Sequence, residues 1–149
     1  MSRVKAKTAA LLASPEDVEG QFYEALREAD LDKLMAAWAE DEDIVCVHPG
    51  GQRQVGVQAV RAAFEAVFGS GPVPVEAQGV RRIHSLSCAV HSVLERIAPP
   101  GADPARVGWV LATNVYLKTT LGWRLVAHHA SPGSAAEPTE PGEAPAVLH

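Results

Sequence analysis

Two polar side chains interrupt an otherwise apolar face near the end of the chain, in the segment RVGWVLATNVYLKTTLGWRLVAHHAS. Its two apolar runs, Val107–Leu117 and Trp123–Ala130, contain no proline and flank a short polar turn, a pattern typical of an antiparallel hairpin. Asn114 and His128 fall on the same face of this hairpin. A polar atom on a buried face needs a hydrogen-bond partner or a ligand. We therefore expect these two side chains to bond to each other or to contact a ligand.

Two further ionisable side chains lie in β-type runs. His48 ends the run IVCVH, directly before a Pro-Gly-Gly turn. A neutral imidazole can take up a proton near pH 7, so His48 either serves a pocket or simply caps the turn. Glu95 lies in VLERI, an apolar β-type run in which a carboxylate is unusual. It is either a pocket acid or, as we favour slightly, the partner of a nearby arginine, namely Arg81, Arg82 or Arg96.

A metal site is a weaker interpretation of the same residues. His48, Glu95 and His128 could converge, and histidines with a carboxylate suit zinc or iron. No pair has the close spacing of a metal motif on a helix, and adjacent residues 128 and 129 point to opposite faces of a strand. We expect no metal and no cofactor.

Helices are predicted first and strands last, which indicates an α+β layer with helices on one face of the sheet. Ser14-Pro15 is a typical helix start, and helical spacing continues to about Ala29. Asp30 can cap a second helix, whose apolar stripe includes Trp38. This tryptophan either packs in the core or contacts a ligand. Gly56 and Gly69 bracket a third helix. The expected strands cover residues 44–48, 75–84 and 88–97, followed by the final hairpin.

The final hairpin is apolar on both faces, so we expect it in the middle of the sheet. Alternation sends one set of side chains toward the helices and a pocket: Val110, Ala112, Asn114, Tyr116 and His128. The other set is expected to face a partner or a second layer: Trp109, Leu111, Val115, Leu125 and His129.

Length and composition suit one domain. The 149 residues are expected to form a lead-in at 1–13, a domain at 14–131 and a Pro/Glu-rich tail at 132–149. A net charge of −5 argues against a nucleic-acid partner. No apolar run reaches the roughly 18 residues of a membrane helix, and the N-terminus does not resemble a secretory signal. We expect a cytoplasmic protein.

Three segments resemble the NTF2-like superfamily, in its SnoaL-like and ketosteroid-isomerase-like branch: YEALREADLDKLMAAWAEDEDIVCVHPGG, QVGVQAVRAAFEAVF and TNVYLKTTLGWRLVAHHASP. The resemblance covers about residues 15–132. It implies an α+β cone, in which a curved antiparallel sheet wraps around three N-terminal helices, and a homodimer formed through the convex sheet face.

The resemblance also implies roles for particular residues. Ketosteroid isomerases place an oxyanion-donating tyrosine near the end of the first helix, where this chain has Tyr23. Their catalytic aspartate precedes a proline after the first strand, where this chain has His48. This departure retains a possible base but changes its chemistry. Asn114 is the nearest candidate for their second, protonated aspartate.

Three functions remain open, since this fold supports many activities. The first is binding of a small apolar or aromatic molecule in the cone, against Trp38, Glu95, Val110, Asn114 and His128. The second is an isomerase, cyclase or dehydratase with His48 as general base and Tyr23 as oxyanion donor. The third is a non-catalytic dimer module whose cone is filled by its own side chains.

Overall fold

The computed structural model describes residues 12–133. The expected lead-in and tail therefore lie almost entirely outside the described residues. Along the chain the elements are α2 (Pro15–Glu28), α3 (Leu31–Ala36), β1 (Val45–Val47), β2 (Arg53–Val55), α4 (Val57–Phe68), β3 (Val75–His84), β4 (Cys88–Ile97), the short 3₁₀ helix η1 (Pro104–Arg106), β5 (Gly108–Thr119) and β6 (Gly122–Pro132).

The helix boundaries follow from local chemistry. The Ser14 side chain accepts a hydrogen bond from the Asp17 backbone N–H at 3.1 Å, and a proline opens α2. Asp30 caps α3 in the same way through Lys33 N–H at 3.0 Å. Gly56 and Gly69 flank α4 as expected. Among the described residues, no helix has both the length and the apolar character needed to cross a membrane.

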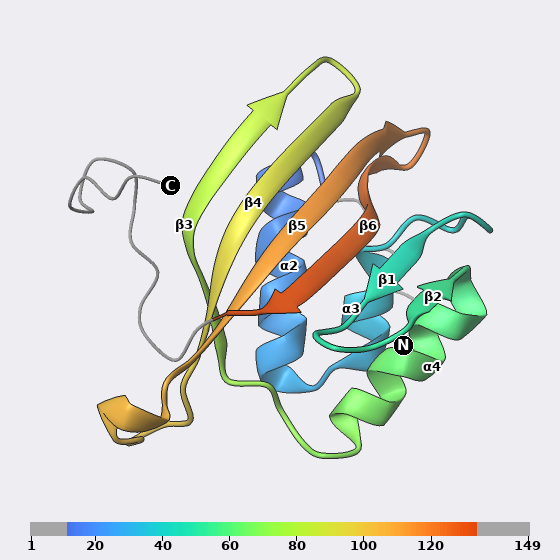
Figure 1. Cartoon of the computed structure of the whole chain (residues 1–149). Helices are drawn as coiled ribbons and strands as arrows, with labels where there is room; N and C mark the ends of the chain where they lie inside the picture. Colours follow the sequence, from blue (N-terminus) through green and yellow to red (C-terminus); the bar gives the residue numbers. More distant parts are fainter. Residues whose placement is uncertain (1–11, 134–149) are drawn as a thin grey trace.

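Six strands form one bent sheet in the order β2-β1-β6-β5-β4-β3, with the helices on one side of it (Figure 1). This confirms the predicted α+β cone. The four long strands β3 to β6 are antiparallel neighbours, as expected. The sheet is nevertheless mixed, because the short strand β1 pairs in parallel with β6. This pairing places the end of β1 beside the second half of the final hairpin.

Aromatic rings fill much of the space between the helices and the sheet. The ring centroid of Phe22 in α2 lies 5.9 Å from that of Phe64 in α4 and 6.4 Å from that of Trp38. All three side chains are buried and belong to the hydrophobic core. The helices are therefore held against the concave face by burial of large apolar side chains.

A β-bulge changes the faces of the final hairpin. Val115 pairs with Ala127 but Tyr116 pairs with Leu125, so Val126 is the extra residue in β6. Leu125 consequently turns toward the helices and is fully buried. The prediction that Leu125 faces outward was wrong, because simple alternation ignores the bulge. Leu111 and His129 are exposed on the other face, as expected.

Candidate functional site

A row of polar side chains crosses the concave face of the sheet. Cross-strand pairing aligns His91 of β4 with Asn114 of β5, Asn114 with His128 of β6, and His128 with Cys46 of β1. His91 and Asn114 are fully buried, and His128 is 5% exposed. The inward orientation predicted for Asn114 and His128 is thus confirmed.

Four buried side chains form a continuous hydrogen-bond network between α2 and this face. The Tyr23 hydroxyl donates to Glu95 Oε2 at 2.7 Å. Asn114 Nδ2 donates to the Tyr23 oxygen at 2.9 Å. Asn114 Oδ1 lies 2.5 Å from His128 Nδ1, and an amide oxygen only accepts, so His128 donates from Nδ1. The chain of donors runs from His128 through Asn114 and Tyr23 to Glu95.

Burial sets the ionisation of this network. It raises the pKa of Glu95 to about 7, although the hydrogen bond from Tyr23 opposes the change. It raises the pKa of Tyr23 well above its ordinary value, an effect strengthened by the charge of Glu95. Burial also lowers the pKa of His128 to about 3, so this imidazole is neutral at pH 7. Glu95 is therefore the network member that can exchange a proton near neutral pH.

The favoured interpretation of Glu95 as an arginine partner was wrong, because Glu95 is buried and bonded to Tyr23, and no described arginine contributes to its pKa shift. Arg96 instead lies 3.8 Å from Glu76, and Arg82 lies 3.4 Å from Glu19. Glu95 turns inward because it shares the face of β4 on which Ala89, His91 and Val93 are buried. That alternation was visible in the sequence and was the signal that favoured the other interpretation, a pocket acid.

No described hydrogen bond joins His48 to the network, although its charge is near enough to His128 to help lower the pKa of that histidine. Its ring centroid is 4.9 Å from that of Phe64, and Phe64 in turn contacts Phe22, the neighbour of Tyr23. His48 Nε2 is buried without a hydrogen-bond partner among the described residues, and burial lowers the His48 pKa. The fold therefore connects His48 to Tyr23 through packed rings and no described hydrogen bond joins the two side chains.

Two pockets adjoin predicted site residues. One of about 660 Å³ is lined by Trp38 together with polar and apolar residues of α3, α4 and the β5–β6 turn. The indole Nε1 of Trp38 is also buried without a partner in the described part of the chain. The second pocket, of about 430 Å³, lies between α2 and β3 and includes Tyr23. Neither pocket is lined by His48, Glu95, Val110, Asn114 or His128. Val110 instead pairs with Glu95 across β4 and β5.

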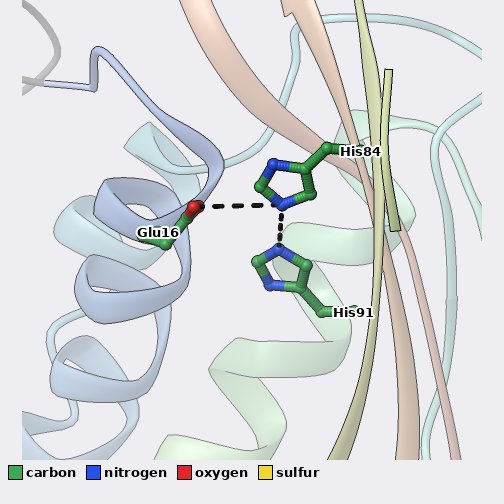
Figure 2. A group of neighbouring side chains, drawn as sticks. All are labelled: Glu16, His84 and His91. Atoms are coloured by element: carbon green, nitrogen blue, oxygen red, sulfur yellow. Dashed lines mark hydrogen bonds and ion pairs between the residues drawn. The ribbon is translucent and has the colours of Figure 1, made fainter. Parts of the chain in front are cut away.

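A second polar cluster was missed by the sequence analysis. Ligand atoms of Glu16, His84 and His91 lie within 4.8 Å of one another, in a spacing that could hold a metal ion (Figure 2). The spacing of the two histidines across the β3–β4 turn was the available signal. Both residues fall on the same face once the hairpin register is known.

Comparison with known proteins agrees with the fold. Residues 16–135 match the model of a family described as the SnoaL-like domain. No curated protein sequence is similar enough to count as a match. A Thiobacillus denitrificans structure, named as a candidate calcium/calmodulin-dependent protein kinase type II association domain, is 35% identical with a TM-score of 0.77. That match covers 83% of this chain and 98% of that chain.

Two other solved structures bear on the branch. A candidate dehydratase of the NTF2-like family from Streptomyces avermitilis is 27% identical, with a TM-score of 0.67, over 78% of this chain and 92% of that chain. A candidate ketosteroid isomerase from Parabacteroides distasonis is 17% identical, with a TM-score of 0.64, over 80% of this chain and 87% of that chain. At 17% identity the second match shows the fold alone. The predicted NTF2-like, SnoaL-like branch is confirmed.

Proposed function

Because the chain belongs to the family of SnoaL-like domains, we propose that it binds a small, largely apolar carbonyl compound beside Tyr23 and exchanges a proton with it through Glu95. The reaction class is that of an isomerase or dehydratase. This proposal keeps Tyr23 as the hydrogen-bond donor expected from the resemblance. It assigns the proton transfer to Glu95 in place of His48.

The hydrogen bond between Tyr23 and Glu95 carries the proposal. A general acid or base works best when its pKa lies near the working pH, and burial brings the pKa of Glu95 to about 7. The Tyr23 hydroxyl is held by Asn114 and already points at a carboxylate oxygen. A substrate oxygen that enters beside Glu95 would accept the single Tyr23 hydroxyl proton in place of the carboxylate oxygen. Asn114 would still hold the tyrosine oxygen, and the new hydrogen bond would stabilise developing negative charge on the substrate.

The pocket between α2 and β3 supports substrate access to this pair. Tyr23 lines it directly, and so does Ala77, which pairs with Glu95 across β3 and β4. Arg27 and Glu19 also line this pocket and offer charged groups to a substrate. The 27% identity to a candidate dehydratase supports the reaction class.

The experiment uses a panel of steroid, polyketide and terpenoid-like ketones, with turnover and ligand-induced thermal shift as readouts. We expect Glu95→Gln to lower turnover by about 10²–10⁴-fold while the thermal shift persists, since the amide retains the shape but cannot exchange the proton. His48→Ala is the matched control and should retain most of the turnover. Turnover that survives Glu95→Gln but disappears in His48→Ala would return the role of base to His48.

A thermal shift without turnover, equal in both variants, would leave a binding protein. This outcome corresponds to simple binding of an apolar ligand in the cone. In that case the unpartnered Nε2 of His48 and Nε1 of Trp38 become the first candidate ligand contacts, because a buried polar atom gains from a hydrogen bond.

Assembly through the convex sheet face is the second candidate function. Leu111 and Leu117 of β5 are 43% and 40% exposed on this face. The Thiobacillus denitrificans relative, which is named as an association domain, supports the same idea. We expect sedimentation to give a dimer or larger assembly, and Leu111→Lys to shift it toward monomer. A monomer for the unmodified chain at high micromolar concentration would refute this function.

A further inference from the structure

We propose that Glu16, His84 and His91 bind one divalent transition-metal ion, with Zn²⁺ as the reference case, independently of the site at Glu95. The cluster joins the first turn of α2 to the β3–β4 hairpin (Figure 2). It would supply two imidazole nitrogens and one carboxylate oxygen. This donor set suits zinc and leaves a fourth position for water.

The secondary structure brings the three ligands together. Arg82 pairs with His91 and His84 pairs with Ala89, so the two histidines are diagonal neighbours on one face of the hairpin. That face points toward α2. Glu16 is the second residue of α2, whose first turn is fixed by its serine cap. The arrangement therefore depends on ordinary helix and hairpin geometry.

The distances are close to those of a tetrahedral site. His84 Nε2 and His91 Nε2 lie 3.2 Å apart. Two nitrogens that each lie about 2.05 Å from a tetrahedral zinc ion are roughly 3.3 Å apart. Glu16 Oε1 lies 3.9 Å from His84 Nε2, and nearly half of the Glu16 side chain is exposed. The two Nε2 atoms face each other in a hydrogen bond, so metal binding requires the His84 ring and the Glu16 carboxylate to rotate until their lone pairs converge with that of His91.

Glu19 orients one of the ligands. His91 Nδ1 donates to Glu19 Oε1 at 2.9 Å, and the His91 side chain is fully buried. A neutral His91 whose proton is on Nδ1 presents the lone pair of Nε2 to the metal position. This carboxylate–histidine arrangement commonly supports metal-ligating histidines. Arg82 approaches the other Glu19 oxygen at 3.4 Å and balances part of its charge.

Metal binding takes the place of the hydrogen bond between the two histidines, and the proton on His84 Nε2 moves to Nδ1. With no metal, His84 Nε2–H can donate to His91 Nε2 across the same 3.2 Å. When the metal binds, His84 must present a lone pair from Nε2 and keep its single proton on Nδ1. No residue is oxidised or reduced. The ion would tie the N-terminus of α2 to the hairpin and thereby stabilise the folded state.

The test uses the full chain without an affinity tag, because a histidine tag would bind the same ions. Competition with a chromophoric chelator should give one tightly bound Zn²⁺ per chain. We expect His84→Gln and Glu16→Gln to weaken binding by at least about tenfold. Loss of a residue that only supports a metal ligand typically costs about 10–100-fold in affinity, and loss of a ligand should cost no less. His129→Gln, which changes an exposed histidine on the opposite face, is the matched control and should bind like the unmodified chain. Circular dichroism establishes that each variant is folded.

A second measurement separates ligation from a structural effect. Co²⁺ bound to the unmodified chain should give visible absorption bands, and Glu16→Gln should shift them because an oxygen ligand is altered. Glu19 is a positioning residue. The Glu19→Gln variant should therefore bind Co²⁺ more weakly but through the same three ligand atoms. Absence of Zn²⁺ binding by the unmodified chain would overturn the proposal. Equal binding by the unmodified chain and folded His84→Gln would do the same.

Discussion

The Tyr23 hydroxyl donates a 2.7 Å hydrogen bond to Glu95, a residue 72 positions further along the chain. This bond joins α2 to β4 of the sheet. The same tyrosine oxygen accepts a hydrogen bond from Asn114, which lies in the next strand. Because both interactions are buried, the tyrosine stabilises the fold and also determines how Glu95 meets a ligand.

Removal of the tyrosine hydroxyl should destabilise the protein. Tyr23→Phe leaves both Glu95 and Asn114 without this buried partner, and an unsatisfied buried group costs about 1–3 kcal/mol. We expect a loss of that size in the free energy of unfolding, measured by urea titration. Tyr116→Phe is the matched control. The buried Tyr116 hydroxyl makes no hydrogen bond of ordinary geometry among the described residues, although the nearby Asn114 side chain influences its pKa, so its removal should cost less. Equal losses in the two variants would contradict the network.

The stability of the protein should depend on pH through Glu95. Burial raises its pKa from 4.5 to about 7, so between these values the folded state binds more protons than the unfolded chain. The contribution of Glu95 to the free energy of unfolding is therefore complete below pH 4.5 and is lost as pH rises to 7. The full change approaches about 3 kcal/mol at roughly 1.4 kcal/mol per pKa unit.

Glu95→Gln should abolish this contribution. His128 acts in the opposite direction, because burial lowers its pKa to about 3 and its contribution is lost as pH falls below 6.5. His128 is present in both the unmodified chain and the Glu95→Gln variant. Its effect therefore cancels in the difference between their free energies of unfolding. Urea titrations from pH 4.5 to 7.5 should show the unmodified chain losing stability relative to Glu95→Gln as pH rises. A difference that stays constant with pH would mean that Glu95 has an ordinary pKa.

Two glycine substitutions should have opposite effects. Gly20 lies in α2 with no atom within 4 Å of the position of an added Cβ, so Gly20→Ala should stabilise by about 0.5–1 kcal/mol. Gly122 has φ +103°, and an added Cβ would lie 2.7 Å from the Leu12 carbonyl oxygen. We expect Gly122→Ala to destabilise by more than about 1 kcal/mol. Thermal unfolding of both variants would be compared, and a neutral Gly122→Ala would show that the β5–β6 turn adapts.

The β-bulge makes a prediction about two leucines that simple alternation places on the same face. Leu125 is fully buried, whereas Leu117 is 40% exposed. Leu125→Ala should cost about 2–5 kcal/mol, as is usual for a core leucine. Leu117→Ala should cost less than about 1 kcal/mol in the isolated chain. Similar costs from chemical unfolding would argue against the bulge at Val126.

Local features were readable from the sequence because their causes are local. Ser14, Asp30 and Gly69 mark helix ends through capping chemistry that involves only neighbouring residues. The bounds of β3 and β4 agree with the expected ranges, since apolar alternation and turn residues define them. Asn114 and His128 were placed on one inward face for the same reason.

The sequence by itself determined the order of helices and strands, the inward polar pair and the family to which the chain belongs. Tertiary structure decided which side chains meet. The bulge turned Leu125 inward, the hairpin register brought His84 to His91, and the packing of α2 directed Tyr23 to Glu95. These contacts depend on register and on packing between distant segments. Side-chain periodicity within one segment therefore cannot specify them.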